Sequence, residues 1–185
     1  MIEKKFNLLK PKFIPPLDEG FRPAVLANRA FERAVSEVGV PLVIGLEREG
    51  GKLSRFETRV YPEGHPQAEA NLYYVERIVK FLLWQRGGYK VYVGGSPSIA
   101  EYLKSAYSPA GEHQFDNHFM GEQVYGQPFQ VVACDVDEVP PAFEAGASLG
   151  GHLDGCRIGF DLGGSDRKAS AVVDGKVVFS EEVIW

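Results

Sequence analysis

Segment 156–185 combines three runs of strand-forming residues with two turn signals. The runs CRIGF, ASAVV and KVVFSEEVIW are apolar or alternate apolar with polar residues, as strands do. Asp174 and Gly175 lie between the second and third runs, and Asp-Gly is the strongest short signal for a two-residue hairpin. The pattern predicts a three-stranded antiparallel unit, and no other part of the chain constrains its own fold as tightly.

The first turn of this unit, DLGGSDRK, has the composition of a phosphate-binding loop. Gly163 and Gly164 lack a Cβ atom, so backbone N–H groups in the turn can come close to an anion. Asp161 closes the first strand, where a carboxylate can hold Mg²⁺ through water, and Ser165 adds a hydroxyl donor. We therefore expect Asp161 at the rim of the unit, beside an exposed Gly163-Gly164 turn.

The order of strand, DLGGS turn, strand, Asp-Gly turn and strand resembles the first phosphate motif of the ROK family of repressors and sugar kinases. This family belongs to the sugar kinase, heat-shock protein and actin superfamily. The resemblance implies that Asp161 organises Mg²⁺ and that Gly163, Gly164 and Ser165 face the phosphates of ATP, with Lys168 close by. It also implies that the full-length protein binds a nucleotide and a sugar, and uses ATP and Mg²⁺ once the kinase domain is complete.

The chain departs from the family where the family typically has Thr-Lys, because Ser165 and Asp166 occupy these two positions. Serine keeps the hydroxyl group, whereas Asp166 adds negative charge beside a phosphate site. Lys168 either compensates for this charge or does not, and the sequence leaves both alternatives open.

The resemblance covers only residues 156–185. The family's later Asn-Asp catalytic motif, its His/Cys zinc motif and its adenosine-binding second lobe have no counterpart in this sequence. We therefore expect the N-terminal portion of a ROK-like ATP-dependent sugar kinase, inactive as an isolated fragment. The alternatives are a non-catalytic binding or regulatory module of the same superfamily, and an independent α/β domain whose DLGGS turn is accidental.

Composition divides the chain into four segments. Residues 1–23 hold four of the twelve prolines without a hydrophobic period and are expected to form an extended arm. Residues 24–141 are expected to form an α/β domain, and residues 142–155, rich in Pro, Gly and small residues, a linker. Residues 156–185 then begin the ROK- or actin-like ATPase domain.

The α/β domain is predicted to contain a mixed sheet with flanking helices. Two strand-like runs flank EGGK and indicate a hairpin, while YKVYV and FQVVACDV, separated by a helix, indicate neighbouring central strands. The hairpin aligns with ASAVVDGKVVFSEEVIW of the closing unit. The domain is therefore either a degenerate ribonuclease H-like half-lobe or an unrelated α/β fold.

Capping residues predict where the helices begin and end. Asn28 and Asn71 are predicted N-caps of two helices, and Gly87 is predicted to end the second. Residues 108–128 are expected to be loop-like, with an irregular hairpin.

The VGGSPS turn between a strand and a helix permits two interpretations. Gly94, Gly95 and Ser96 either form a possible anion-binding turn at the positive end of the helix, or a tight turn with a Ser96 cap and a Pro97 start.

The HQFDNH stretch also permits two interpretations. His113, Asp116 and His118 either converge on a metal ion or are solvated and capping residues of a polar loop.

The net charge of −5 argues against nucleic acid as the main partner. The N-terminus lacks the apolar segment of a signal peptide, and no apolar run approaches the roughly 18 residues of a membrane span. We therefore expect a soluble cytoplasmic protein without membrane contact. Because unpaired strand edges are a liability, the closing hairpin should dock onto the preceding domain or form a homodimer.

Overall fold

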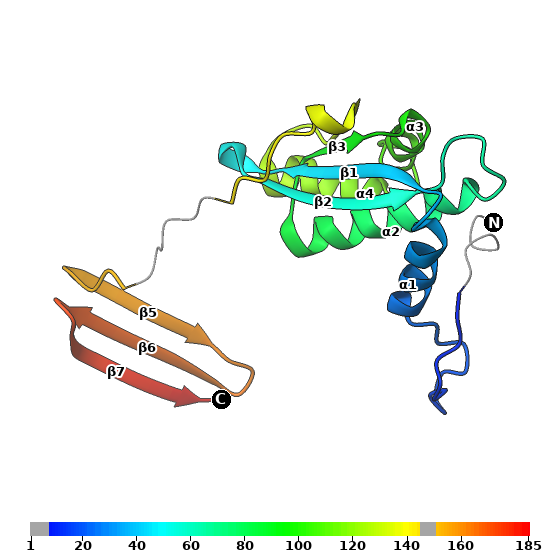
Figure 1. Ribbon diagram of the computed structural model, residues 1–185. Coiled ribbons are helices and arrows are strands. Elements are labelled where there is room, and N and C mark those ends of the chain that lie inside the picture. Colours follow the sequence, from blue (N-terminus) through cyan, green and yellow to red (C-terminus); the bar gives the residue numbers. More distant parts are fainter. Residues whose placement is uncertain (1–7, 145–150) are drawn as a thin grey trace. The chain divides into compact units, whose positions relative to one another are not determined.

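The computed structural model describes residues 8–144 and 151–185, and the chain divides into two compact units at residue 144 (Figure 1). The predicted α/β class is confirmed: the first unit holds helices and a mixed sheet, and the second an antiparallel sheet. Residues 8–23 of the predicted arm contain no helix or strand.

The sheet of the first unit has four strands in the order β2-β1-β3-β4. Its strands are β1 (Val40–Glu47), β2 (Leu53–Val60), β3 (Lys90–Gly94) and β4 (Gln130–Cys134). β1 is antiparallel to both β2 and β3, whereas β3 and β4 are parallel. The predicted hairpin and the predicted pairing of β3 with β4 are confirmed. The expectation that both are central strands is wrong for β4, because β4 is an edge strand with partly exposed side chains.

One face of this sheet carries the hydrophobic core. The core side chains of β1 and β3 are at most 1% exposed, and they are Leu42, Ile44, Leu46, Val91 and Val93. They pack with the buried sides of three helices, α1 (Ala24–Val35), α2 (Glu69–Arg86) and α3 (Pro97–Ala106). Figure 1 shows α2 running along the sheet. Each large aliphatic side chain buried in this way contributes roughly 1.5–3 kcal/mol to stability.

The other face is covered by the segment that follows β4. Val139, just after the short helix η4 (Val136–Glu138), is 3% exposed and lies against Gly45 and Gly94. A Cβ atom on Gly45 would lie 2.9 Å from a Val139 methyl, and one on Gly94 would lie 2.5 Å from the other. Both strands therefore need glycine at the point where this segment crosses them.

Two of the predicted helix ends are confirmed and two predicted N-caps are wrong. Ser96 caps α3 by accepting a hydrogen bond from Ile99 N–H at 3.4 Å, and Gly87 ends α2 with φ 78°, as predicted. Asn28 is not a cap, because α1 begins four residues earlier, directly after Pro23. Proline fixes its own φ and disfavours helical backbone in the residue before it, so the helix starts there.

Asn71 is not a cap either, because α2 begins at Glu69 and Asn71 lies inside it, 5% exposed. Its Oδ1 accepts a hydrogen bond from Tyr61 N–H at 3.0 Å, and its Nδ2 donates to Tyr61 C=O at 2.8 Å. The amide thus pairs both backbone groups of a residue that follows the end of β2. Burying these groups is tolerable because both are paired.

The prediction of loop structure across residues 108–128 is wrong. This region contains α4 (Gln114–His118) followed by the π-helix η3 (Phe119–Tyr125). The polar sequence resembles a loop, but the segment is anchored by the buried Asp116, whose partners lie on α2.

The second unit forms the predicted three-stranded antiparallel sheet, with β6 between β5 and β7. Its strands are β5 (Cys156–Leu162), β6 (Asp166–Val173) and β7 (Lys176–Ile184). Asp174 and Gly175, which join β6 to β7, have φ values of 46° and 79°. Positive φ at both central residues is what a type I′ hairpin turn requires, so the Asp-Gly prediction is confirmed.

The role of Asn71 yields a first testable prediction. Replacing Asn71 with Leu leaves the N–H and C=O of Tyr61 buried without partners, so the free energy of unfolding should fall by about 3 kcal/mol. The measurement is urea denaturation followed by circular dichroism. Asn28→Leu on α1 is the matched control and should change stability by less than about 0.5 kcal/mol. Equal effects of the two substitutions would contradict this role of Asn71.

Candidate functional site

The candidate phosphate-binding turn joins β5 to β6. Asp161 is the penultimate residue of β5 and is exposed, and the turn itself consists of Gly163, Gly164 and Ser165. Gly164 and Ser165 are exposed, and Gly163 is partly covered. Asp161 thus lies one residue before the end of β5, where an accessible turn begins to leave the strand. Its backbone is held by the pairing of β5 with β6.

Two backbone donors of this turn are free. Gly163 N–H donates to Asp166 C=O at 2.8 Å, which closes the turn. Within the described part of the chain, by contrast, no residue accepts a hydrogen bond from the N–H of Gly164 or Ser165. A Cβ atom on Gly164 would meet nothing within 4 Å, so space lies next to these donors. The turn can therefore offer two N–H groups to an anion.

The strand register places charged residues in one row beside the turn. Asp161 lies opposite Lys168 on β6, and Lys168 lies opposite Glu182 on β7. Asp166, two residues before Lys168, lies on the same face because side chains alternate along a strand. Three carboxylates therefore share this face with one ammonium group.

Lys168 interacts with two of these carboxylates. Its Nζ lies 2.9 Å from Asp166 Oδ2 and 3.6 Å from Glu182 Oε1. The hydrogen bond from Lys168 lowers the pKa of Asp166, and this bond together with the charge of Glu182 raises the pKa of Lys168. Lys168 thus does interact with the extra charge of Asp166. The carboxylate of Asp161 has no ion pair or hydrogen bond with any described residue.

The same face contains a shallow hollow of about 400 Å³. Its lining combines small residues with charged ones, and it includes Gly159, Phe160, Asp161, Lys168, Ser170, Ser180, Glu181 and Glu182. A polar ligand beside the turn could extend over this surface.

The VGGSPS turn contains an anion that the chain itself supplies. The carboxylate of Glu63 accepts a hydrogen bond from Ser98 N–H at 3.2 Å and lies 3.4 Å from Ser96 Oγ. Hydrogen bonds from Ser98, with a smaller contribution from Ser96, lower the pKa of Glu63. A Cβ atom on Gly95 would lie 2.7 Å from Pro41 C=O, so the turn is also tightly packed. Gly94, Gly95 and Ser96 therefore form a tight capped turn, and the Glu63 carboxylate lies at the hydroxyl of Ser96 and the N–H of Ser98.

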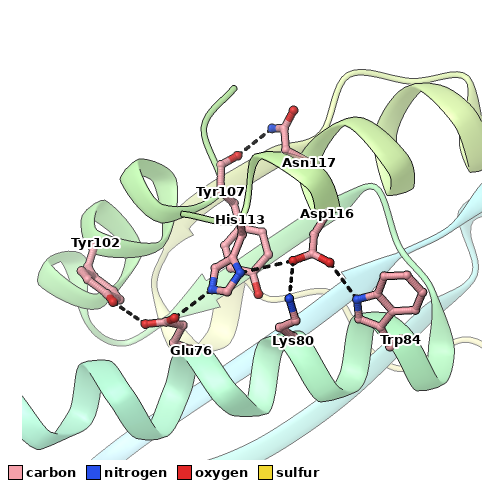
Figure 2. Close-up of polar contacts among 8 residues, drawn as sticks. All are labelled: Glu76, Lys80, Trp84, Tyr102, Tyr107, His113, Asp116 and Asn117. Carbon is pink, nitrogen blue, oxygen red and sulfur yellow. Dashed lines mark hydrogen bonds and ion pairs between the residues drawn. The ribbon is translucent and has the colours of Figure 1, made fainter. Parts of the chain in front are cut away.

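His113 and Asp116 come together, but His118 does not join them (Figure 2). His113 Nδ1 lies 3.2 Å from Asp116 Oδ2 and its Nε2 lies 2.8 Å from Glu76 Oε1, whereas His118 pairs with Glu122. The interpretation as solvated loop residues is wrong for Asp116, which is 1% exposed. Among the residues that the structure describes, no group of three or more His, Cys, Asp or Glu side chains could hold a metal ion.

Asp116 instead connects α4 to α2. Its Oδ2 accepts a hydrogen bond from Lys80 Nζ and its Oδ1 one from Trp84 Nε1, both at 2.8 Å (Figure 2). Glu76 also accepts a hydrogen bond from Tyr102 on α3. Sequence reasoning missed Glu76, Lys80 and Trp84, although their spacing of four residues places them on one side of a helix.

The comparisons with known proteins leave the family open. No family model matches the chain, and neither the curated proteins nor the solved structures contain a significant match. Assignment to a family therefore depends on the residues and geometry of the chain itself. Within residues 8–144 and 151–185, none of the helices has the length and apolar character that crossing a bilayer requires.

The anchoring role of Asp116 can be tested by Asp116→Ala. The substitution removes the partner of Lys80, Trp84 and one nitrogen of His113, so the free energy of unfolding should fall by about 3 kcal/mol. Glu122→Ala removes an exposed carboxylate from η3 in the same region and should cost less than about 0.5 kcal/mol. Chemical denaturation monitored by circular dichroism measures both. A loss below about 1 kcal/mol for Asp116→Ala would refute the anchoring role.

The lowered pKa of Glu63 predicts a pH dependence. A carboxyl group whose pKa is lower in the folded than in the unfolded state stabilises the fold above its ordinary pKa, and this contribution disappears as the pH falls. Glu63→Gln should therefore lower the thermal midpoint at pH 6, and this difference should shrink as the pH falls below the ordinary carboxyl pKa. Glu37→Gln is the exposed control. A midpoint difference that persists unchanged at about pH 3 would contradict the charged cap.

Proposed function

We propose that the β5–β6 turn binds the phosphates of a magnesium-bound nucleotide, as the first phosphate hairpin of a ROK-like ATP-dependent sugar kinase. One observation carries the proposal. An exposed carboxylate that forms no ion pair or hydrogen bond with a described residue, that of Asp161, lies near the end of β5 and close in sequence to two free backbone N–H groups, those of Gly164 and Ser165. Carboxylate and backbone N–H are the groups that Mg²⁺ and phosphate oxygens require.

Each residue has a defined role in this proposal. Asp161 holds the metal through water, the Gly164 and Ser165 amides donate to phosphate oxygens, and the Ser165 hydroxyl supplies a further donor. Gly163 closes the turn through its bond to Asp166 C=O and so fixes the direction of the two donors. The metal would supply positive charge that offsets the phosphate charge.

The first unit is proposed to be an accessory domain in front of this hairpin. Its order of hairpin, helix, strand, helix and strand, with β3 parallel to β4, supports a degenerate ribonuclease H-like half-lobe, whereas the antiparallel pairing of β1 with β3 favours an unrelated α/β fold. In this proposal the hairpin contributes phosphate binding, and transfer of the γ-phosphate of ATP to a sugar hydroxyl is proposed for the complete protein.

One observation favours the alternative, a non-catalytic binding or regulatory module of the same superfamily. Asp166 stands where the resembling family has lysine, and its carboxylate forms an ion pair with the nearest ammonium group, that of Lys168. A turn with this charge distribution attracts phosphate less strongly than one with a free lysine. A module that senses a nucleotide needs only the binding step.

An NMR titration of the ¹⁵N-labelled chain with Mg·ATP tests phosphate binding. We expect the amide signals of Gly163, Gly164 and Ser165 to shift first and furthest. Asp161→Asn should weaken binding by about tenfold or more, because the metal loses its carboxylate. Asp154→Asn removes an exposed carboxylate that precedes β5 and is not among the residues lining the hollow, so it should leave the affinity unchanged. Absence of shifts at the turn, or equal affinity of the Asp161→Asn variant, would overturn the proposal.

A further inference from the structure

The side chain of Asp166 lies over the phosphate-binding turn. A Cβ atom on Gly163 would overlap with Asp166 Oδ1, so the carboxylate is close to the backbone of the turn. The side chain is 17% exposed, compared with 54% for Glu182, the other carboxylate that contacts Lys168. Asp166 is thus the carboxylate that the structure holds against the backbone of the turn.

Lys168 cannot act as a free cation for such an anion. Its ammonium lies 2.9 Å from Asp166 Oδ2 and 3.6 Å from Glu182 Oε1, and Asp161 is its cross-strand neighbour. Because Lys168 lowers the pKa of Asp166, the Asp166 carboxylate stays ionised at neutral pH. Asp161, Asp166, Lys168 and Glu182 together carry net negative charge, although the two free amides are suited to an anion.

A divalent cation resolves this conflict. A bare phosphate chain at the turn is repelled by Asp161 and Asp166, whereas a phosphate–metal complex presents positive charge to the same two carboxylates. We propose that Asp166 is a specificity-determining residue that makes this turn reject metal-free phosphate and accept phosphate bound to a divalent cation. This inference rests on the proposed phosphate site and adds the form of ligand that the site selects.

The test uses the full chain and inorganic tripolyphosphate, with either excess Mg²⁺ or EDTA. Dissociation constants are obtained from the amide shifts of Gly163, Gly164 and Ser165. Wild type should bind at least about tenfold more tightly with Mg²⁺ than in EDTA. Asp166→Asn and Asp166→Ala should each gain about tenfold in EDTA, and the alanine variant excludes a new donor from the asparagine amide.

Glu182→Gln is the matched control, because it frees the same lysine from a carboxylate that lies further from the turn. It should change the ratio of the two dissociation constants by less than about threefold. Equal affinity of wild type with and without metal would overturn the inference while leaving phosphate binding intact. An unchanged ratio in both Asp166 variants would overturn it as well.

Failure of the proposed function has a different signature. If the amide signals of the wild-type turn do not shift when tripolyphosphate and Mg²⁺ are added, the wild-type protein has no phosphate site at this turn. The acceptance of metal-bound phosphate then falls as well, and the rejection of metal-free phosphate by Asp166 stands only if the Asp166 variants bind tripolyphosphate in EDTA.

Discussion

The pairing register of the strands determines which side chains meet in both units. In the second unit, Asp161 lies opposite Lys168 and Lys168 opposite Glu182, so one row of charges crosses the sheet beside the turn. A slip of one residue between β5 and β6 would move the side chains of one strand to the opposite face and separate this row. In the first unit, the same period of two places the core side chains of β1 towards the helices and Gly45 towards Val139.

Features that depend on a few neighbouring residues could be predicted from the sequence. The Asp174-Gly175 turn, the Ser96 cap and the Gly87 helix end each need one backbone conformation that their residues favour. The exposed Gly164 follows from the same local reasoning, whereas Gly163, also expected to be exposed, is partly covered. The role of phosphate ligand remains a prediction, because neither the structure nor the comparisons test it.

Features that depend on distant residues could not be predicted. Asn71 has the side chain of a cap, yet it lies inside α2 because Tyr61 needs partners for both of its backbone groups. The helical turns after His113 exist because Asp116 is buried against Lys80 and Trp84, more than thirty residues earlier in the sequence. Glu63 likewise accepts a hydrogen bond from Ser98, which lies 35 residues later in the sequence. Nothing in the VGGSPS sequence indicates that the chain supplies its own anion.

The central claim is that Asp161 and the adjacent turn hold a metal-bound phosphate. Its most direct test replaces Mg²⁺ with paramagnetic Mn²⁺, which broadens the NMR signals of nuclei close to the metal. With substoichiometric Mn·ATP, the account predicts that the amide signals from Asp161 to Ser165 broaden before all others. Broadening that begins at other exposed carboxylates, such as Glu122 or Asp137, while these signals stay sharp, would contradict it.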